Sequence, residues 1–95
     1  MPYNDLQIPP SAQGKDGIEV LRAAIIDGGL YVTLRRAFDD PSAWGILLAD
    51  VARQVAGAYA HEKMGEAEDV VSAIRDAFTN EVEKPQNAGS IAPIE

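Results

Sequence analysis

The sequence feature that most constrains the fold is the run Asp27-Gly28-Gly29, which lies between two segments rich in β-branched and other apolar residues. An Asp-Gly pair favours a type I′ turn, because both central residues of that turn have positive φ, and such turns connect the strands of hairpins. We therefore predict a β-hairpin over residues 18–38.

Two registers are open to this hairpin, with a two-residue loop that starts either at Asp27 or at Gly28. The loop starting at Gly28 would place Arg22 directly opposite Arg35, and like charges in that position destabilise a strand pair. The loop starting at Asp27 avoids this pair. We therefore predict the register that goes with it.

In either register the strand residues alternate between two faces. One face is wholly apolar and consists of Leu21, Ala23, Ile25, Leu30, Val32 and Leu34. The other is half apolar and consists of Val20, Arg22, Ala24, Ile26, Tyr31, Thr33 and Arg35. We expect the apolar face to pack on helices. The residues of the second face other than Thr33 form a candidate interface with a second subunit.

A helix start follows at Asp39-Asp40-Pro41. A carboxylate suits the N-cap, and proline suits the first helical position because its missing N–H costs nothing there. Capping therefore accounts for the two aspartates better than acid–base catalysis does. The helix should run from Pro41 to about Lys63, with Gly65 in the left-handed position that ends it.

This first helix has distinct faces. Apolar residues recur at helical spacing along one face: Trp44, Leu47, Leu48, Val51, Val55, Ala58 and Tyr59. A polar stripe lies opposite and contains Asp50, Arg53, Gln54, Gly57 and His61. Three alanines spaced four apart would allow another element to approach closely: Ala52, Ala56 and Ala60.

A second helix is predicted from about Glu66 to Lys84. Its first turn is acidic, which the helix dipole favours, and Pro85 forbids continuation. Its apolar stripe contains Ala67, Val70, Val71, Ile74, Ala77, Phe78 and Val82. The predicted fold class is therefore α+β: a β-hairpin followed by two antiparallel helices packed on one face, in the order β-β-α-α.

Ninety-five residues allow one domain. We assign residues 1–17 to an extended N-terminal arm, 18–84 to a single α+β domain and 85–95 to a mobile C-terminal tail. The chain has no cysteine, and its start has neither a basic nor a long apolar stretch, so a cytoplasmic location is expected.

Charge is distributed unevenly. Residues 1–38 are neutral overall, while residues 39–95 hold the whole net charge of −7. An acidic surface repels nucleic acid and anionic membranes, so neither is expected as a partner. Positive charge clusters at Arg22, Arg35 and Arg36. The last two could bind an anion, but we favour a solvated strand end in which Arg36 faces Glu19.

His61 is the sole histidine and therefore the first candidate for a catalytic or metal-binding residue. Ser42 is distant on the same helix and Ser72 lies on a polar face, so neither predicts an activated nucleophile. His61, Glu62 and Glu66 make a poor metal site, because adjacent helical residues point about 100° apart. We therefore predict no catalytic residue, no metal and no cofactor.

The residues from the hairpin turn to the first helix resemble a family of small uncharacterised bacterial proteins, classed as a domain of unknown function. The resemblance rests on Asp27, Gly28, Gly29, Phe38, Asp39, Asp40, Pro41, Trp44 and Gly45, and it covers roughly residues 4–80. It implies an alphaproteobacterial-type origin. It implies no activity, substrate or catalytic residue.

These observations favour a non-enzymatic interaction or assembly protein. A small core without disulfides or metals often depends on oligomerisation, and a two-stranded sheet leaves unpaired edges, so a homodimer is expected. An unknown protein partner is a further possibility. The alternative is an enzyme or small-ligand binder with a pocket between subunits that uses Arg22, Tyr31 or Arg35.

Overall fold

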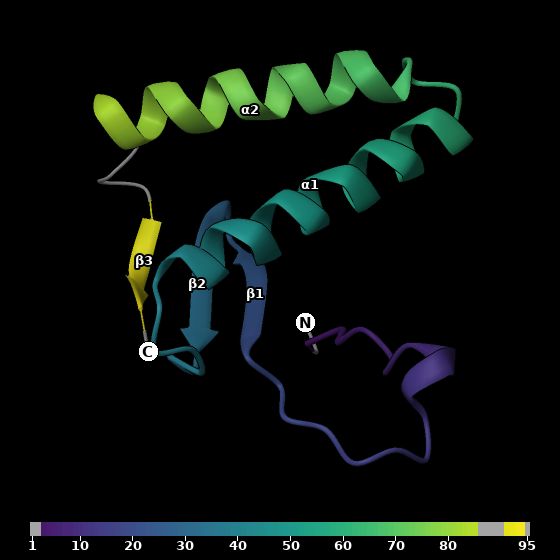
Figure 1. Cartoon of the computed structure of the whole chain (residues 1–95), viewed down its shortest axis with the longest axis vertical. Helices are drawn as coiled ribbons and strands as arrows, with labels where there is room; N and C mark the ends of the chain where they lie inside the picture. The colour runs from purple at the N-terminus through teal and green to yellow at the C-terminus, as the bar shows by residue number, and fades with distance from the viewer. Residues whose placement is uncertain (1–2, 86–90, 95) are drawn as a thin grey trace.

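A computed structural model describes residues 3–85 and 91–94 of the chain. In chain order the elements are η1 (Pro10–Ala12), β1 (Leu21–Ile26), β2 (Gly29–Leu34), α1 (Ser42–His61), α2 (Ala67–Glu83) and β3 (Ile91–Ile94) (Figure 1). The hairpin is followed by two helices that run antiparallel (Figure 1). The predicted α+β class and the order β-β-α-α are thereby confirmed.

The hairpin has the predicted register. β1 and β2 are antiparallel, and the pairing runs from Leu21 opposite Leu34 to Ile26 opposite Gly29. The loop residues Asp27 and Gly28 have φ angles of 51° and 80°, the signs that a type I′ turn requires. Because Arg22 lies opposite Thr33 in this register, the two arginines do not meet across the strands.

A third strand joins the sheet where the sequence predicted only a tail. β3 pairs in parallel with β2, which gives the strand order β1-β2-β3 among the described residues. The physical reason is that the outer edge of β2 offers unpaired backbone groups, and isoleucine, which stands at 91 and 94, favours strands. Residues 86–90 and 95 lie outside the described part.

α1 begins as predicted. Pro41 already has helical angles, φ −58° and ψ −25°. The side chain of Asp40 accepts a hydrogen bond of 2.9 Å from the backbone N–H of Ser42, and its carbonyl accepts one of 3.0 Å from Ala43. Asp40 therefore acts as the N-cap.

The end of α1 differs from the prediction. Lys63 takes the left-handed conformation, with φ of 60°, whereas Gly65 has an extended positive φ of 143°. The N–H of Lys63 bonds Ala60 and that of Met64 bonds Tyr59, the two hydrogen bonds of a Schellman motif. These bonds require the left-handed residue directly after the C-cap, so the turn selects position 63 over the glycine two residues later.

The two helices pack through the alanine stripe of α1. Ala56 is 1% exposed, and Ala52 and Ala60 on either side of it are half-buried. Small side chains allow the helix axes to approach, which is the close packing that their four-residue spacing predicted. Val70 and Ile74 are half-buried residues of the facing helix.

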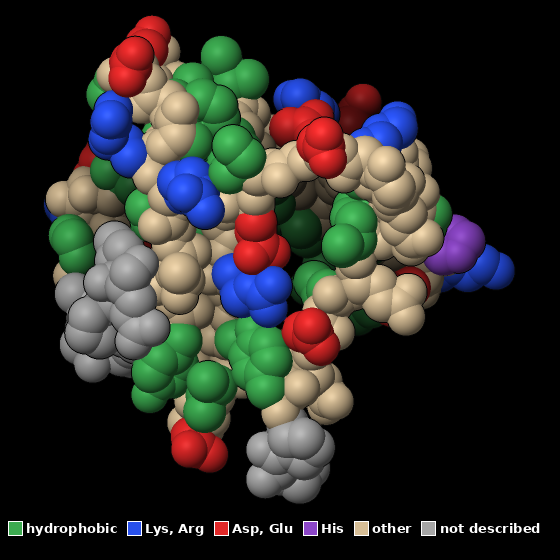
Figure 2. Space-filling model, turned by 90° about the horizontal axis from the view of Figure 1, so that it is seen from below, with side chains coloured by type: hydrophobic (Ala, Val, Ile, Leu, Met, Phe, Trp, Pro, Cys, Tyr) green, Lys and Arg blue, Asp and Glu red, His purple; other side chains and the backbone are tan. Residues whose placement is uncertain are grey.

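Coverage of the apolar sheet face is incomplete, contrary to the expectation that both helices cover it. Leu21, Leu30 and Val32 are half-buried, but Ile25 is 71% exposed and Leu34 is 38% exposed. The extensive contacts of the described elements lie within the sheet and between the helices. The helices therefore pack mainly on each other, and hydrophobic side chains remain on the outside (Figure 2).

Candidate functional site

The second sheet face holds the six residues that the sequence predicted as an interface. The alternation of β1 and β2 brings Arg22, Ala24, Ile26 and Tyr31 to this face, with Val20 and Arg35 just beyond the strand ends. Ala24 and Val20 are half-buried, while Ile26 and Tyr31 are each 43% exposed. The structure thus places all six together on one surface.

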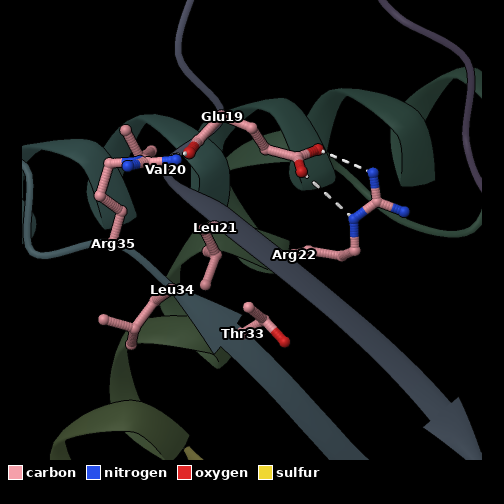
Figure 3. A pocket seen from close by; sticks show the side chains of 7 residues that line it. All are labelled: Glu19, Val20, Leu21, Arg22, Thr33, Leu34 and Arg35. Carbon is pink, nitrogen blue, oxygen red and sulfur yellow. Dashed lines mark hydrogen bonds and ion pairs between the residues drawn. The ribbon is translucent and has the colours of Figure 1, made fainter. Parts of the chain in front are cut away.

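Glu19 organises the arginines of this face (Figure 3). Its carboxylate accepts two hydrogen bonds from Arg22, of 3.2 Å from Nε and 3.1 Å from Nη2. Its backbone carbonyl accepts a bond of 3.3 Å from Nε of Arg35. A bidentate pair fixes the orientation of a guanidinium. Glu19 therefore positions the side chains of both Arg22 and Arg35.

The predicted pairing of Arg36 with Glu19 is wrong. Arg36 instead forms an ion pair of 3.2 Å with Asp39, three residues later. The reason lies in the backbone: Ala37 has φ of 60°, which turns the chain away from the hairpin directly after Arg36. Arg36 therefore belongs to the connection into α1 and not to the candidate site.

The N-terminal arm reaches this face through Tyr3. Hydrogen bonds with Glu19 and with Tyr3 raise the pKa of Arg22 above its ordinary value. Leu6 and Ile8, the residues expected to pack, are 94% and 64% exposed. Sequence reasoning missed Tyr3, because nothing in the sequence ties it to the hairpin, and it gave Glu19 the wrong partner, Arg36 in place of Arg22.

Two open hollows lie along the hairpin. The first has a volume of about 300 Å³ and is shown in Figure 3; it is lined by Glu19, Val20, Leu21, Arg22, Thr33, Leu34 and Arg35. The second has a volume of about 230 Å³ and is lined by Tyr3, Arg22, Ala24, Ile26, Tyr31 and Thr33. Their polar groups are guanidinium, carboxylate, hydroxyl and phenol; because the Glu19 carboxylate already pairs with Arg22, Arg35 is the guanidinium that could bind a small carboxylate ligand.

The other chemical candidates lie elsewhere. His61 is exposed in the last turn of α1. Asp39 and Asp40 serve the start of that helix, as capping predicted. Across residues 3–85 and 91–94, no three histidine or acidic side chains gather as metal ligands would. Within that part, neither helix has the length and hydropathy that crossing a bilayer requires.

A family model of the domain of unknown function DUF5076 matches residues 5–86. The chain belongs to this family. The resemblance predicted from the hairpin turn and the Phe38–Gly45 segment is thereby confirmed. The alphaproteobacterial origin stays a prediction.

A solved structure of a bacterial protein is similar to nearly the whole chain. It is provisionally described as a pyruvate dehydrogenase from the photosynthetic bacterium Rhodopseudomonas palustrus CGA009. The two proteins are 38% identical, with a TM-score of 0.76, and the match covers 99% of this chain and 95% of the other. Among curated proteins, none matches.

Proposed function

We propose that this DUF5076 protein is a non-enzymatic interaction or assembly module whose functional form is a homodimer. The observation that carries the proposal is its large exposed surface. The chain exposes 8325 Å², whereas a compact chain of its mass, 10.2 kDa, exposes roughly 5,300 Å². The excess is about 3,000 Å².

The dimensions of the chain agree with that excess. Its radius of gyration is 15.1 Å, against about 12 Å for a compact domain of the same length. Obligate homodimers bury about 2,000–5,000 Å² in total, which is about 1,000–2,500 Å² on each chain and more than transient complexes bury. An excess of this size on one chain supports a permanent partner, and a second copy is always present at the same concentration.

Charge and composition limit the other partners. A net charge of −7 disfavours nucleic acid and anionic membranes, so neither belongs to the proposal. The chain contains no cysteine, which suits a reducing compartment, and the cytoplasm is therefore the proposed location.

Light scattering after size-exclusion chromatography at micromolar concentration tests the proposal directly. We expect twice the chain mass, and we expect each tenfold dilution to lower Tm by about 2–5 °C, since dissociation and unfolding are then linked. A monomer mass together with a Tm that is independent of concentration would overturn the proposal.

The alternative function is a small-ligand site formed with a second subunit, and one observation favours it. Arg22 and Arg35 line a hollow at the end of the hairpin, and the similar Rhodopseudomonas protein carries the name of an enzyme that acts on pyruvate, a small carboxylate. Guanidinium groups bind carboxylates with two parallel hydrogen bonds.

Titration with pyruvate, followed by NMR shifts of the backbone amides, separates the two functions. Ligand binding predicts saturable shifts at residues 19–22 and 33–35 that disappear in Arg35→Ala and persist in the control Arg53→Ala. Arg53 is a suitable control because it lies on the polar stripe of α1, where it pairs with Asp50 at 3.4 Å. Unchanged spectra at millimolar pyruvate would eliminate this alternative for that ligand.

A further inference from the structure

A line of partly exposed, largely apolar side chains runs along α1. We call it the α1 stripe and define it as Leu48, Val51, Val55 and Tyr59, which are 38%, 43%, 38% and 43% exposed. The steps of three and four residues keep these side chains on one line of the helix surface. Such a line is the pattern with which one helix packs against another.

α2 does not cover this stripe. It packs on the alanine stripe, whose centre is Ala56, and Val55 points about 100° away from Ala56 around the helix axis. The alanine stripe and the α1 stripe therefore both lie on the apolar half of α1. α2 of the same chain packs on the alanine stripe. The α1 stripe is left for another partner.

The polar groups of α1 keep away from the stripe and satisfy one another. Asp50 pairs with Arg53 at 3.4 Å and accepts a bond of 2.7 Å from Gln54. No charged residue of α1 lies on its apolar half. A partner seated on the α1 stripe would therefore bury no unpaired charge, a burial that costs several kcal/mol where it happens.

The second sheet face lacks this property. Arg22 and Arg35 lie on it, and Arg22 already has Glu19 and Tyr3 as partners. Covering that face with a second copy would bring four arginines close to the interface. Of the two surfaces, the α1 stripe is the one that a second copy can bury at lower electrostatic cost.

We infer that a second copy of this chain docks on the α1 stripe with its own α1 stripe, so that the two helix pairs form a four-helix arrangement around a two-fold axis. This inference rests on the proposed homodimer and names its interface. An isologous contact places the same residues on both sides, which suits a stripe without charged side chains, in which Tyr59 carries the one hydroxyl. Four-helix packing would also remove the second long side of α1 from water.

The experiment compares three glutamate variants at exposed apolar positions by sedimentation over a concentration series. Val55→Glu lies on the stripe. Ile46→Glu is the matched control, because residue 46 is 71% exposed on the same helix and points about 180° away from residue 55. Ile26→Glu tests the second sheet face.

We expect Val55→Glu to raise the dimer dissociation constant by about 100-fold or more, because a carboxylate would be buried without a partner. Ile46→Glu and Ile26→Glu should change it by less than about threefold. If Val55→Glu stays as dimeric as the unaltered chain, or if Ile26→Glu alone dissociates, the inferred interface is overturned while the homodimer stands. A monomeric unaltered chain overturns both.

A second measurement does not depend on how the glutamate variants fold. Since the chain has no cysteine, a single cysteine at position 55 or 46 carries one spin label per subunit. With helix axes about 8–10 Å apart, labels at 55 should lie within about 20 Å of each other, and labels at 46 beyond about 30 Å. The reverse order of distances would contradict the inference.

Discussion

Positive φ angles occur at three non-glycine residues of the described chain, and each marks a change of chain direction. Asp27 turns the hairpin at 51°, Ala37 separates the sheet from α1 at 60°, and Lys63 ends α1 at 60°. The first was predictable, because Asp-Gly is a turn signal. The other two were not, because neither alanine nor lysine favours the left-handed region.

Replacing Lys63 by glycine should stabilise the protein. A non-glycine residue in the left-handed region costs about 1–2 kcal/mol, and the greater backbone entropy of unfolded glycine offsets about half of the gain. Lys63→Gly should therefore raise the free energy of unfolding by about 0.5–1 kcal/mol in urea titrations. Lys63→Ala, which keeps the strain, serves as the control, and equal stability of the two variants would contradict the assignment.

Asp40 makes stability depend on pH. Hydrogen bonds from Ser42 lower the pKa of this carboxyl in the folded chain, so the unfolded chain binds the proton more readily. The contribution of Asp40 to the free energy of unfolding is fully present above the pKa of the unfolded chain, about 3.9. It is lost as the pH falls through the lower pKa of the folded chain.

Asp40→Asn isolates this contribution, because it keeps a capping oxygen but removes the titration. The difference in Tm between the unaltered chain and Asp40→Asn should shrink as the pH falls from about 5 to 2. Asp40→Ala, which lacks the cap, should melt a few degrees lower than Asp40→Asn at every pH. A Tm difference that does not vary with pH would show that the carboxylate is not held by the cap.

At the scale of elements, the sequence predicted those features that depend on neighbouring residues. The type I′ turn determined the strand register, and Asp40 with Pro41 determined where α1 starts. The end of α1, strand β3 and the pairing of Arg36 with Asp39 were missed, because each depends on backbone direction or on residues distant in sequence. Alternation alone placed the six residues of the candidate interface on one face, whereas Tyr3 reaches that face through a tertiary contact and Glu19 through its pairing with Arg22, three residues later.

Trp44 connects the sheet to α1. Its indole N–H donates a bond of 2.8 Å to the carbonyl of Arg36, and its ring packs edge-on against Phe38 with centroids 5.5 Å apart. Trp44→Phe keeps an aromatic ring but removes the donor, which should lower the free energy of unfolding by about 1 kcal/mol.

The measurement is urea unfolding followed by circular dichroism, since Trp44 is the only tryptophan and its fluorescence is lost in the variant. Phe38→Leu, which removes the ring contact but keeps the hydrogen bond, provides the comparison. A variant with phenylalanine at 44 that unfolds at the same urea concentration as the unaltered chain would show that the indole bond contributes nothing.

At the scale of the whole molecule, the helices and strands are formed, but few of their side chains are buried in a core. Between residues 3 and 85, Ala56 alone is buried, while large hydrophobic side chains of both helices and both hairpin strands stay exposed. Sequence patterns identified these residues as apolar faces. They could not say which face meets the same chain and which meets another, because both kinds of burial select the same side chains.

The incomplete core has a consequence for folding kinetics. The hairpin and the helix pair consist of contacts close in sequence, which form within microseconds to milliseconds. In the proposed homodimer, burial of the side chains that stay exposed on the single chain must await an encounter between two chains, so the slowest refolding phase should become faster in proportion to protein concentration. Chains newly made in a cell would stay vulnerable to proteases until that encounter, and the steady-state amount of protein would then rise more steeply than its rate of synthesis.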